Sequence, residues 1–254
     1  MMDVIDLREF YQGALGQSAA GLIRSALQPR LRIHAGQTVM GLGFAHPYFE
    51  NAVPSEAVSF SFMMARQGVL HWPEGEDNRA AAVDERELPL LESVVDHAVV
   101  VHGLELADSP LDMLHEIWRV LAPQGRLYLV VPNRRGLWSS SERSPFGHGQ
   151  PFSRAQLLAL LKEARFSVTW SKEALMLPPF GGASVLKAAR SVETVSARVL
   201  GRFAGVIIVE AMKQVYAFSS GKRARRFVPR LRPVLLPAPQ PLRRSAGGDA
   251  GSSP

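Results

Sequence analysis

Short apolar strands alternate with helices over residues 37–218, and this alternation constrains the fold more than any other feature of the chain. The apolar runs predict strands at residues 38–43, 57–64, 79–83, 94–104, 126–131, 166–170 and 205–218. Apolar side chains spaced three and four apart predict helices at residues 112–121, 154–164 and 183–200. Strands joined by helical crossovers pair mainly in parallel. We therefore predict an α/β fold with a doubly wound, mainly parallel sheet and helices on both faces.

A helical segment is also predicted before the first strand, at residues 6–27. Its apolar side chains form a partial stripe that is interrupted by Gly13 and Gly16. The stripe consists of Leu7, Phe10, Tyr11, Leu15, Leu22 and Ile23. We expect residues 1–29 to form a helical cap that lies against the core or acts as a lid. Residues 30–218 are then the main domain.

The basic charge of the chain is concentrated in its last segment, residues 219–254. That segment holds eight basic residues and one acidic residue, whereas the rest of the chain is nearly neutral. Its Arg, Pro, Gly and Ser content predicts a disordered basic tail. The tail would either meet an anionic partner such as RNA, a membrane or an acidic protein, or have no specific partner. The nearly neutral body gives no specific nucleic-acid signal.

Composition excludes several classes of site. The chain has no cysteine, so disulfides, thiolate metal sites and thiol nucleophiles are excluded. Its histidines lack the spacings typical of zinc sites, and we predict no metal site. No apolar run approaches the roughly 18–20 residues that cross a bilayer. The first ten residues also lack the basic and apolar regions of a secretory signal. Together these features predict a cytoplasmic protein.

The first predicted strand ends in a turn that contains Gly41 and Gly43. Such a turn lets the backbone approach a ligand closely, and the helix that follows presents free N–H groups. The third glycine of the dinucleotide pattern G-x-G-x-x-G is replaced by His46, so that pattern is absent. The segment is either a ligand-binding loop or a tight turn with no further role.

Three motifs surround the fourth and fifth predicted strands. Asp84 is followed by Leu88-Pro89, residues 95–99 read V-D-H-A-V, and residues 116–125 read E-I-W-R-V-L-A-P-Q-G. With P-F-S-R-A-Q-L-L at residues 151–158, they resemble the type 11 family of class I S-adenosylmethionine-dependent methyltransferases. The resemblance covers roughly residues 37–170. It implies a seven-stranded, Rossmann-like sheet and S-adenosylmethionine as the cofactor.

The resemblance assigns cofactor-binding positions to five residues. Gly43 and Ala45 fall in the family's glycine-rich first motif, and Gly41 stands where that motif has an acid. Asp84 matches the acid near the adenine amino group, and His102 follows the fourth strand, where the methyl group and the acceptor would meet. The family's ribose-binding acid has no counterpart in residues 59–67. Each lost charged hydrogen bond would weaken cofactor binding by about 1.5–3 kcal/mol.

Two functions follow from these observations. The first is S-adenosylmethionine-dependent methylation of a small molecule, which requires mainly alignment in a dry pocket. The second is a catalytically silent binding or regulatory module, which predicts a crevice filled by Phe44, Met63 or Met64.

A hydroxyl acceptor would need a general base. The candidates are His102, His46 and His148. His102 is equally compatible with a structural role in the core, and His46 with capping the next helix. The loop at residues 133–152 would overhang the site, and its two arginines, Arg134 and Arg135, would either bind an acidic group or remain solvated.

Overall fold

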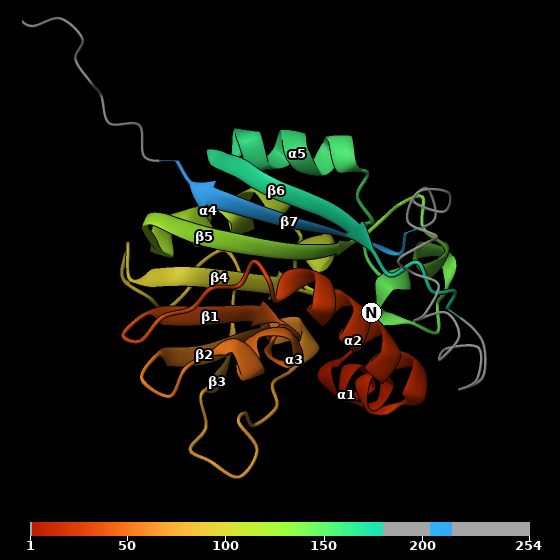
Figure 1. Cartoon of the computed structure of the whole chain (residues 1–254), viewed down its shortest axis with the longest axis horizontal. Helices are drawn as coiled ribbons and strands as arrows, with labels where there is room; N and C mark the ends of the chain where they lie inside the picture. The colour runs from red at the N-terminus through yellow and green to blue at the C-terminus, as the bar shows by residue number, and fades with distance from the viewer. Residues whose placement is uncertain (1, 180–203, 215–254) are drawn as a thin grey trace, which may run out of the picture. The chain divides into compact units, whose positions relative to one another are not determined.

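A seven-stranded sheet is the centre of the computed structural model, which describes residues 2–179 and 204–214 (Figure 1). Its strands are β1 (Thr38–Gly43), β2 (Val58–Met64), β3 (Ala80–Val83), β4 (Val95–Val101), β5 (Leu121–Pro132), β6 (Phe166–Ala174) and β7 (Val206–Lys213). Their spatial order is β3-β2-β1-β4-β5-β7-β6. Strands β1 to β5 pair in parallel, whereas β7 runs antiparallel between β5 and β6. The predicted doubly wound, mainly parallel α/β fold is confirmed.

Helices cover both faces of this sheet, and each strand alternates its side chains between them. Helices α4 (Pro110–Val120) and α5 (Arg154–Glu163) pack on one face, where Met40 and Leu42 of β1 contribute to the core. Helices α2 (Ala14–Leu27) and α3 (His46–Phe49) pack on the other face, with Val39 of β1. Short 3₁₀ turns occupy Glu50–Ala52, Ala65–Gln67, Leu104–Leu106, Leu137–Ser140 and Pro145–Gly147.

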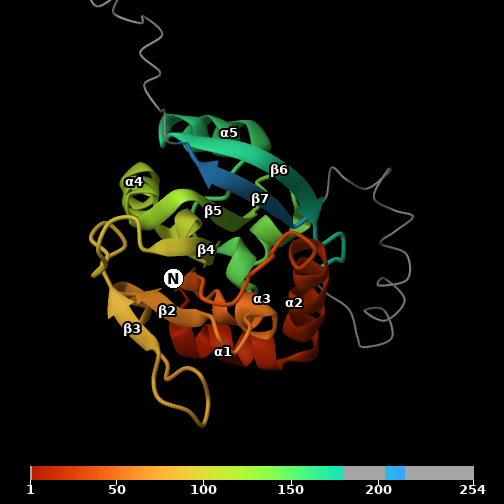
Figure 2. The same ribbon diagram turned by 60° about the vertical axis from the view of Figure 1, so that its left-hand side comes forward.

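The structure has two helices where one continuous helix was predicted at residues 6–27, so the prediction of a single helix was wrong. Helix α1 (Val4–Gln12) begins at Asp3, whose carboxylate accepts hydrogen bonds from two backbone N–H groups of the first turn. It ends at Gly13, whose backbone is extended, and α2 begins at the next residue (Figure 2). Gly16 lies so close to the backbone of Phe10 that a side chain there would clash. The two glycines therefore let α1 fold back on α2.

The E-x-x-R motif in α4 has a structural role. Glu116 accepts a hydrogen bond from the backbone N–H of Leu88 at 2.8 Å. Arg119 donates to the carbonyls of Leu88 and Leu90 and is paired with Glu116. The motif thus fastens the segment between β3 and β4 to α4 and sets where β4 begins.

Two predicted features lie outside the described residues: the helix at 183–200 and the basic tail at 219–254. Within residues 2–179 and 204–214, no helix has the length and apolar character that crossing a bilayer requires.

Candidate functional site

The sheet order reverses between β1 and β4, and ligands of doubly wound folds bind beyond the carboxyl ends of the strands at such a point. Gly43 ends β1 with a positive φ of 76°. The next residue, Phe44, donates its N–H to the carbonyl of Val101 at 2.8 Å. A side chain at position 43 would collide with the backbone of Val101 and His102, so glycine is required to join the ends of β1 and β4 this tightly.

A chain of buried polar side chains starts at the end of β4. Nδ1 of His102 lies 3.3 Å from Oε1 of Glu105, and its Nε2 lies 2.7 Å from the hydroxyl of Tyr11. The Tyr11 hydroxyl lies 2.5 Å from the hydroxyl of Tyr48 in α3. His102 and Glu105 are almost fully buried. The network therefore connects α1, α3 and the segment after β4 at the switch point.

The proton positions in this network follow from its partners. A neutral imidazole that donates from Nδ1 to Glu105 leaves Nε2 free to accept the proton of Tyr11. Burial, reinforced by the neighbouring Tyr48, raises the pKa of Tyr11 well above its usual value. Burial likewise raises the pKa of Tyr48. Both phenols therefore remain protonated near pH 7.

Apolar side chains pack around Phe44, the residue that follows Gly43. Val4 and Leu7 of α1 pack with Phe44 and Met63 in a separate buried cluster. The ring of Tyr11 is stacked on Phe44 with centroids 5.4 Å apart. Phe44, Met63 and also Met64 are almost completely buried, the arrangement that the silent-module hypothesis predicts.

The predicted position of the first-motif acid is occupied by an aromatic ring. A side chain at Gly41 would place its Cβ 2.6 Å from Cε1 of Phe49, and Phe49 is fully buried. Ala45, at the second-glycine position, is also fully buried. Phe49 was missed by sequence reasoning, because only the folded α3 brings it back onto β1.

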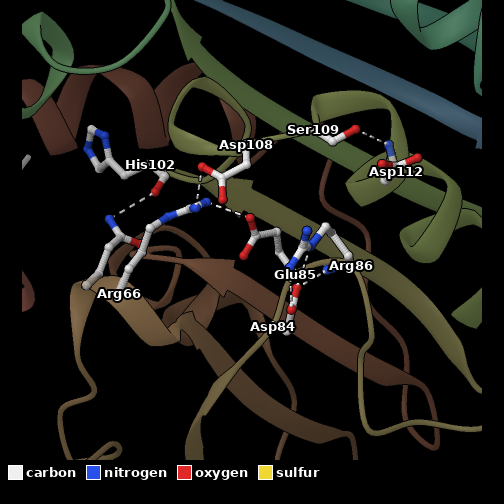
Figure 3. A network of polar contacts seen from close by, with 9 residues as sticks. Arg66, Asp84, Glu85, Arg86, His102, Asp108, Ser109 and Asp112 are labelled. Carbon is white, nitrogen blue, oxygen red and sulfur yellow. Dashed lines mark hydrogen bonds and ion pairs between the residues drawn. The ribbon is translucent and has the colours of Figure 1, made fainter.

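The turn after β2 carries a cation, Arg66, and no acid. Arg66 pairs with Glu85 at 2.5 Å and with Asp108 at 2.8 Å, so it connects the segments that follow β2, β3 and β4 (Figure 3). Gln67 adds a hydrogen bond of 3.4 Å to the carbonyl of His102. Figure 3 shows the imidazole of His102 pointing away from the Arg66 pairs.

Asp84, the predicted adenine-binding acid, lies on the surface. Its carboxylate accepts hydrogen bonds from the side chain and backbone of Arg86, which lower its pKa to about 2. The neighbouring Glu85 is the buried acid of this segment. The structure therefore brings His102 close to the Gly43 turn but places Asp84 in a separate, exposed ion pair.

Glu105 is the acidic residue that sequence reasoning missed at the switch point. Its Oε2 is buried and has no hydrogen-bond partner within the described part of the chain. An unpaired buried carboxylate oxygen is costly, so such an atom indicates a place for a donor or a cation. The sequence signal was available, since Glu105 follows His102 by three residues in H-G-L-E.

An open pocket of about 790 Å³ lies on the outer side of Tyr11 and Phe44. Helix α1, the turn after β1 and the segment after β2 line it, through side chains that include His46 and Trp72. Its volume lies within the range of small-molecule sites, roughly 300–1,000 Å³. None of the five predicted cofactor residues lines it. Tyr11 and Phe44 form a wall between this pocket and His102.

The other candidate side chains lie apart from His102. Burial lowers the pKa of His46 to about 4, so its imidazole is neutral near pH 7. His148 is engaged by the carbonyl of Glu142. Arg134 and Arg135 are exposed in the loop after β5. The same loop supplies Phe146, which is buried with its ring 4.8 Å from that of His102.

Residues 40–129 match the sequence model of a methyltransferase domain. This stretch of the chain is therefore similar to a methyltransferase domain. No curated protein matches the chain.

Several solved structures have a fold similar to that of this chain. One is a chain of the complex between the Haloferax volcanii Trm112 methyltransferase activator and a methyltransferase, with 19% identity and a TM-score of 0.59. That match covers 85% of this chain and 100% of the other. An S-adenosylmethionine-dependent methyltransferase from Thermotoga maritima has 16% identity and a TM-score of 0.55, with 83% and 96% covered.

A third structure, the [4+2]-cyclase SpnF, has 20% identity and a TM-score of 0.51, with 76% of this chain and 80% of the other covered. At these identities the likeness concerns the fold alone.

Proposed function

We propose that this protein is an S-adenosylmethionine-dependent methyltransferase for a small hydroxyl-bearing molecule, and that α1 closes its site when no ligand is bound. The observation that carries the proposal is the His102–Glu105 pair at the carboxyl end of β4. A carboxylate that fixes the imidazole and leaves Nε2 as acceptor is the arrangement that removes a proton from a hydroxyl. In a methyltransferase domain this is where acceptor and methyl group would meet.

The customary acidic anchors of the cofactor do not fit this chain. Phe49 occupies the place of the first acid, and Arg66 stands at the end of β2. Two other acids are buried at the crevice instead, Glu85 after β3 and Glu105 after β4. We propose that these two carboxylates, with the backbone of the Gly43 turn, hold the cofactor.

Binding by these groups requires α1 to move. Tyr11 would leave the crevice and open it toward the adjacent 790 Å³ pocket. Arg66 would exchange one of its two carboxylate partners for solvent or ligand. When bound, the cofactor supplies an electrophilic methyl group; His102 accepts the proton of the acceptor, and the apolar walls exclude water.

Calorimetry with S-adenosylmethionine and its demethylated product tests this assignment. We expect wild-type protein to bind both ligands and Glu105→Gln to bind them about 10- to 100-fold more weakly, the loss of one charged hydrogen bond. The matched control is Glu163→Gln, an exposed acid on α5, which should bind as wild type. If neither wild type nor Tyr11→Ala binds at millimolar ligand, the enzyme assignment is wrong.

The filled crevice favours a second candidate, a catalytically silent binding or regulatory module. Its ligand would enter the open pocket beside Trp72 while the Tyr11–Phe44 wall stays closed. The similarity to SpnF illustrates that a cyclase can have a related fold. This candidate predicts that wild type and Tyr11→Ala, both folded by circular dichroism, bind no S-adenosylmethionine.

A further inference from the structure

Tyr11 is held as a bound aromatic ligand would be held. Its ring is stacked on Phe44 at an interplanar angle of 9°, and Phe10 and Tyr48 present edge contacts at 5.1 and 6.0 Å between centroids. Such stacked and edge-to-face contacts favour an aromatic ring over an aliphatic one. The residues that enclose the ring come from α1, α3 and the turn after β1.

The hydroxyl of Tyr11 is placed where an acceptor would lose its proton. It lies 2.7 Å from Nε2 of His102, while Glu105 fixes the other imidazole nitrogen. Tyr48 contacts the same oxygen at 2.5 Å, so it can stabilise the negative charge that develops there.

We infer that the acceptor of this site is a phenol, and that Tyr11 occupies the acceptor's place in the closed conformation. The inference rests on the function proposed above. The incoming phenol breaks its O–H bond and gives the proton to Nε2 of His102. Its oxygen then bonds to the methyl carbon, and the cofactor's sulfur keeps the electron pair of the bond that breaks.

Displacement of Tyr11 can be measured in wild-type protein without any cofactor. Arg8 is exposed in the middle of α1, and trypsin cleaves a helix only after it opens locally. We expect p-cresol, the side-chain analogue of tyrosine, to accelerate cleavage after Arg8 at least about threefold. Toluene, which lacks the hydroxyl, and 4-methylcyclohexanol, which lacks the aromatic ring, should leave the rate unchanged.

Two variants distinguish specific recognition of the phenol from non-specific binding in a cavity. Tyr11→Ala should bind p-cresol about tenfold more tightly than toluene, because one hydrogen bond to His102 is worth about 1.4 kcal/mol. In Phe166→Ala, which loses a buried ring that carries no hydroxyl, toluene should bind at least as tightly as p-cresol. Should Phe166→Ala not fold, Tyr11→Ala combined with His102→Phe serves instead and should lose the preference for p-cresol.

The inference is overturned if p-cresol does not accelerate cleavage of wild-type protein, or if Tyr11→Ala binds toluene as tightly as p-cresol. Separate calorimetry with S-adenosylmethionine distinguishes a failure of this inference from a failure of the methyltransferase assignment. Preference for phenol without cofactor binding would refute the methyltransferase assignment and leave a phenol site. Cofactor binding without that preference would refute the phenol alone.

Discussion

The hydroxyl of Tyr11 lies 2.7 Å from Nε2 of His102, although 91 positions separate the two residues in the chain. Tyr11→Phe keeps the stacked ring but leaves Nε2 and the Tyr48 hydroxyl without this partner. We expect a loss of about 1–3 kcal/mol in the free energy of unfolding, measured with urea. Tyr128→Phe, which removes a single hydrogen bond to the carbonyl of Arg30, is the control and should lose less. Equal losses would show that the Tyr11 hydroxyl contributes no more to stability than the Tyr128 hydroxyl does.

His102 is expected to control the rate and not the cofactor affinity. With a phenolic acceptor, His102→Ala should lower kcat by about 10²- to 10⁴-fold, the usual contribution of a general base. The dissociation constant of S-adenosylmethionine should change little, because the variant leaves Glu105 in place. Steady-state kinetics and calorimetry on the same preparation give both numbers. A wild-type kcat in His102→Ala would show that His102 is not the general base.

Stability should depend on pH through His46. Burial lowers its pKa from 6.5 to about 4, so the unfolded chain takes up a proton before the folded one does as the pH falls. The contribution is absent above pH 6.5, grows as the pH falls toward 4, and destabilises the fold by at most about 3 kcal/mol there. His46→Gln should flatten the urea-denaturation profile between pH 6.5 and 4. His115→Gln, an exposed histidine on α4, should not.

Adding a side chain at Gly41 should destabilise the protein. In Gly41→Ala the new Cβ would lie 2.6 Å from Cε1 of Phe49, which cannot move freely because it is fully buried. We expect a loss of about 1–3 kcal/mol, typical of overpacking. Combination with Phe49→Leu should cost less than the sum of the two single changes, by about 1 kcal/mol. Strict additivity in the double-mutant cycle would mean that the two positions do not compete for space.

Much of the fold could be predicted because each strand carries its own local signal. The predicted first strand at residues 38–43 coincides with β1, and the helix predicted at 112–121 differs from α4 by one or two residues at its ends. Those boundaries are set by Gly43 and by Ser109, which caps α4. The break between α1 and α2 was not predicted, although Gly13 and Gly16 interrupt the apolar stripe there, because apolar side chains recur on both sides of the two glycines.

The site was harder to predict, because its decisive contacts join distant segments. Periodicity shows that Tyr11 belongs to an apolar stripe, but not that its hydroxyl reaches His102. The absence of the first acid is visible in the sequence, whereas Phe49 as the occupant of its place is not. Likewise, nothing local indicates that Arg66 meets Asp108.

The docking of α1 onto the segment after β4 also affects cotranslational folding. A ribosome adds about 5–20 residues per second, so His102 is synthesised on the order of 5–20 s after Tyr11. An isolated helix of nine residues is marginal in water. The nascent chain therefore carries Leu7 and Phe10 unprotected until β4 has emerged, and chaperones have that interval in which to bind them.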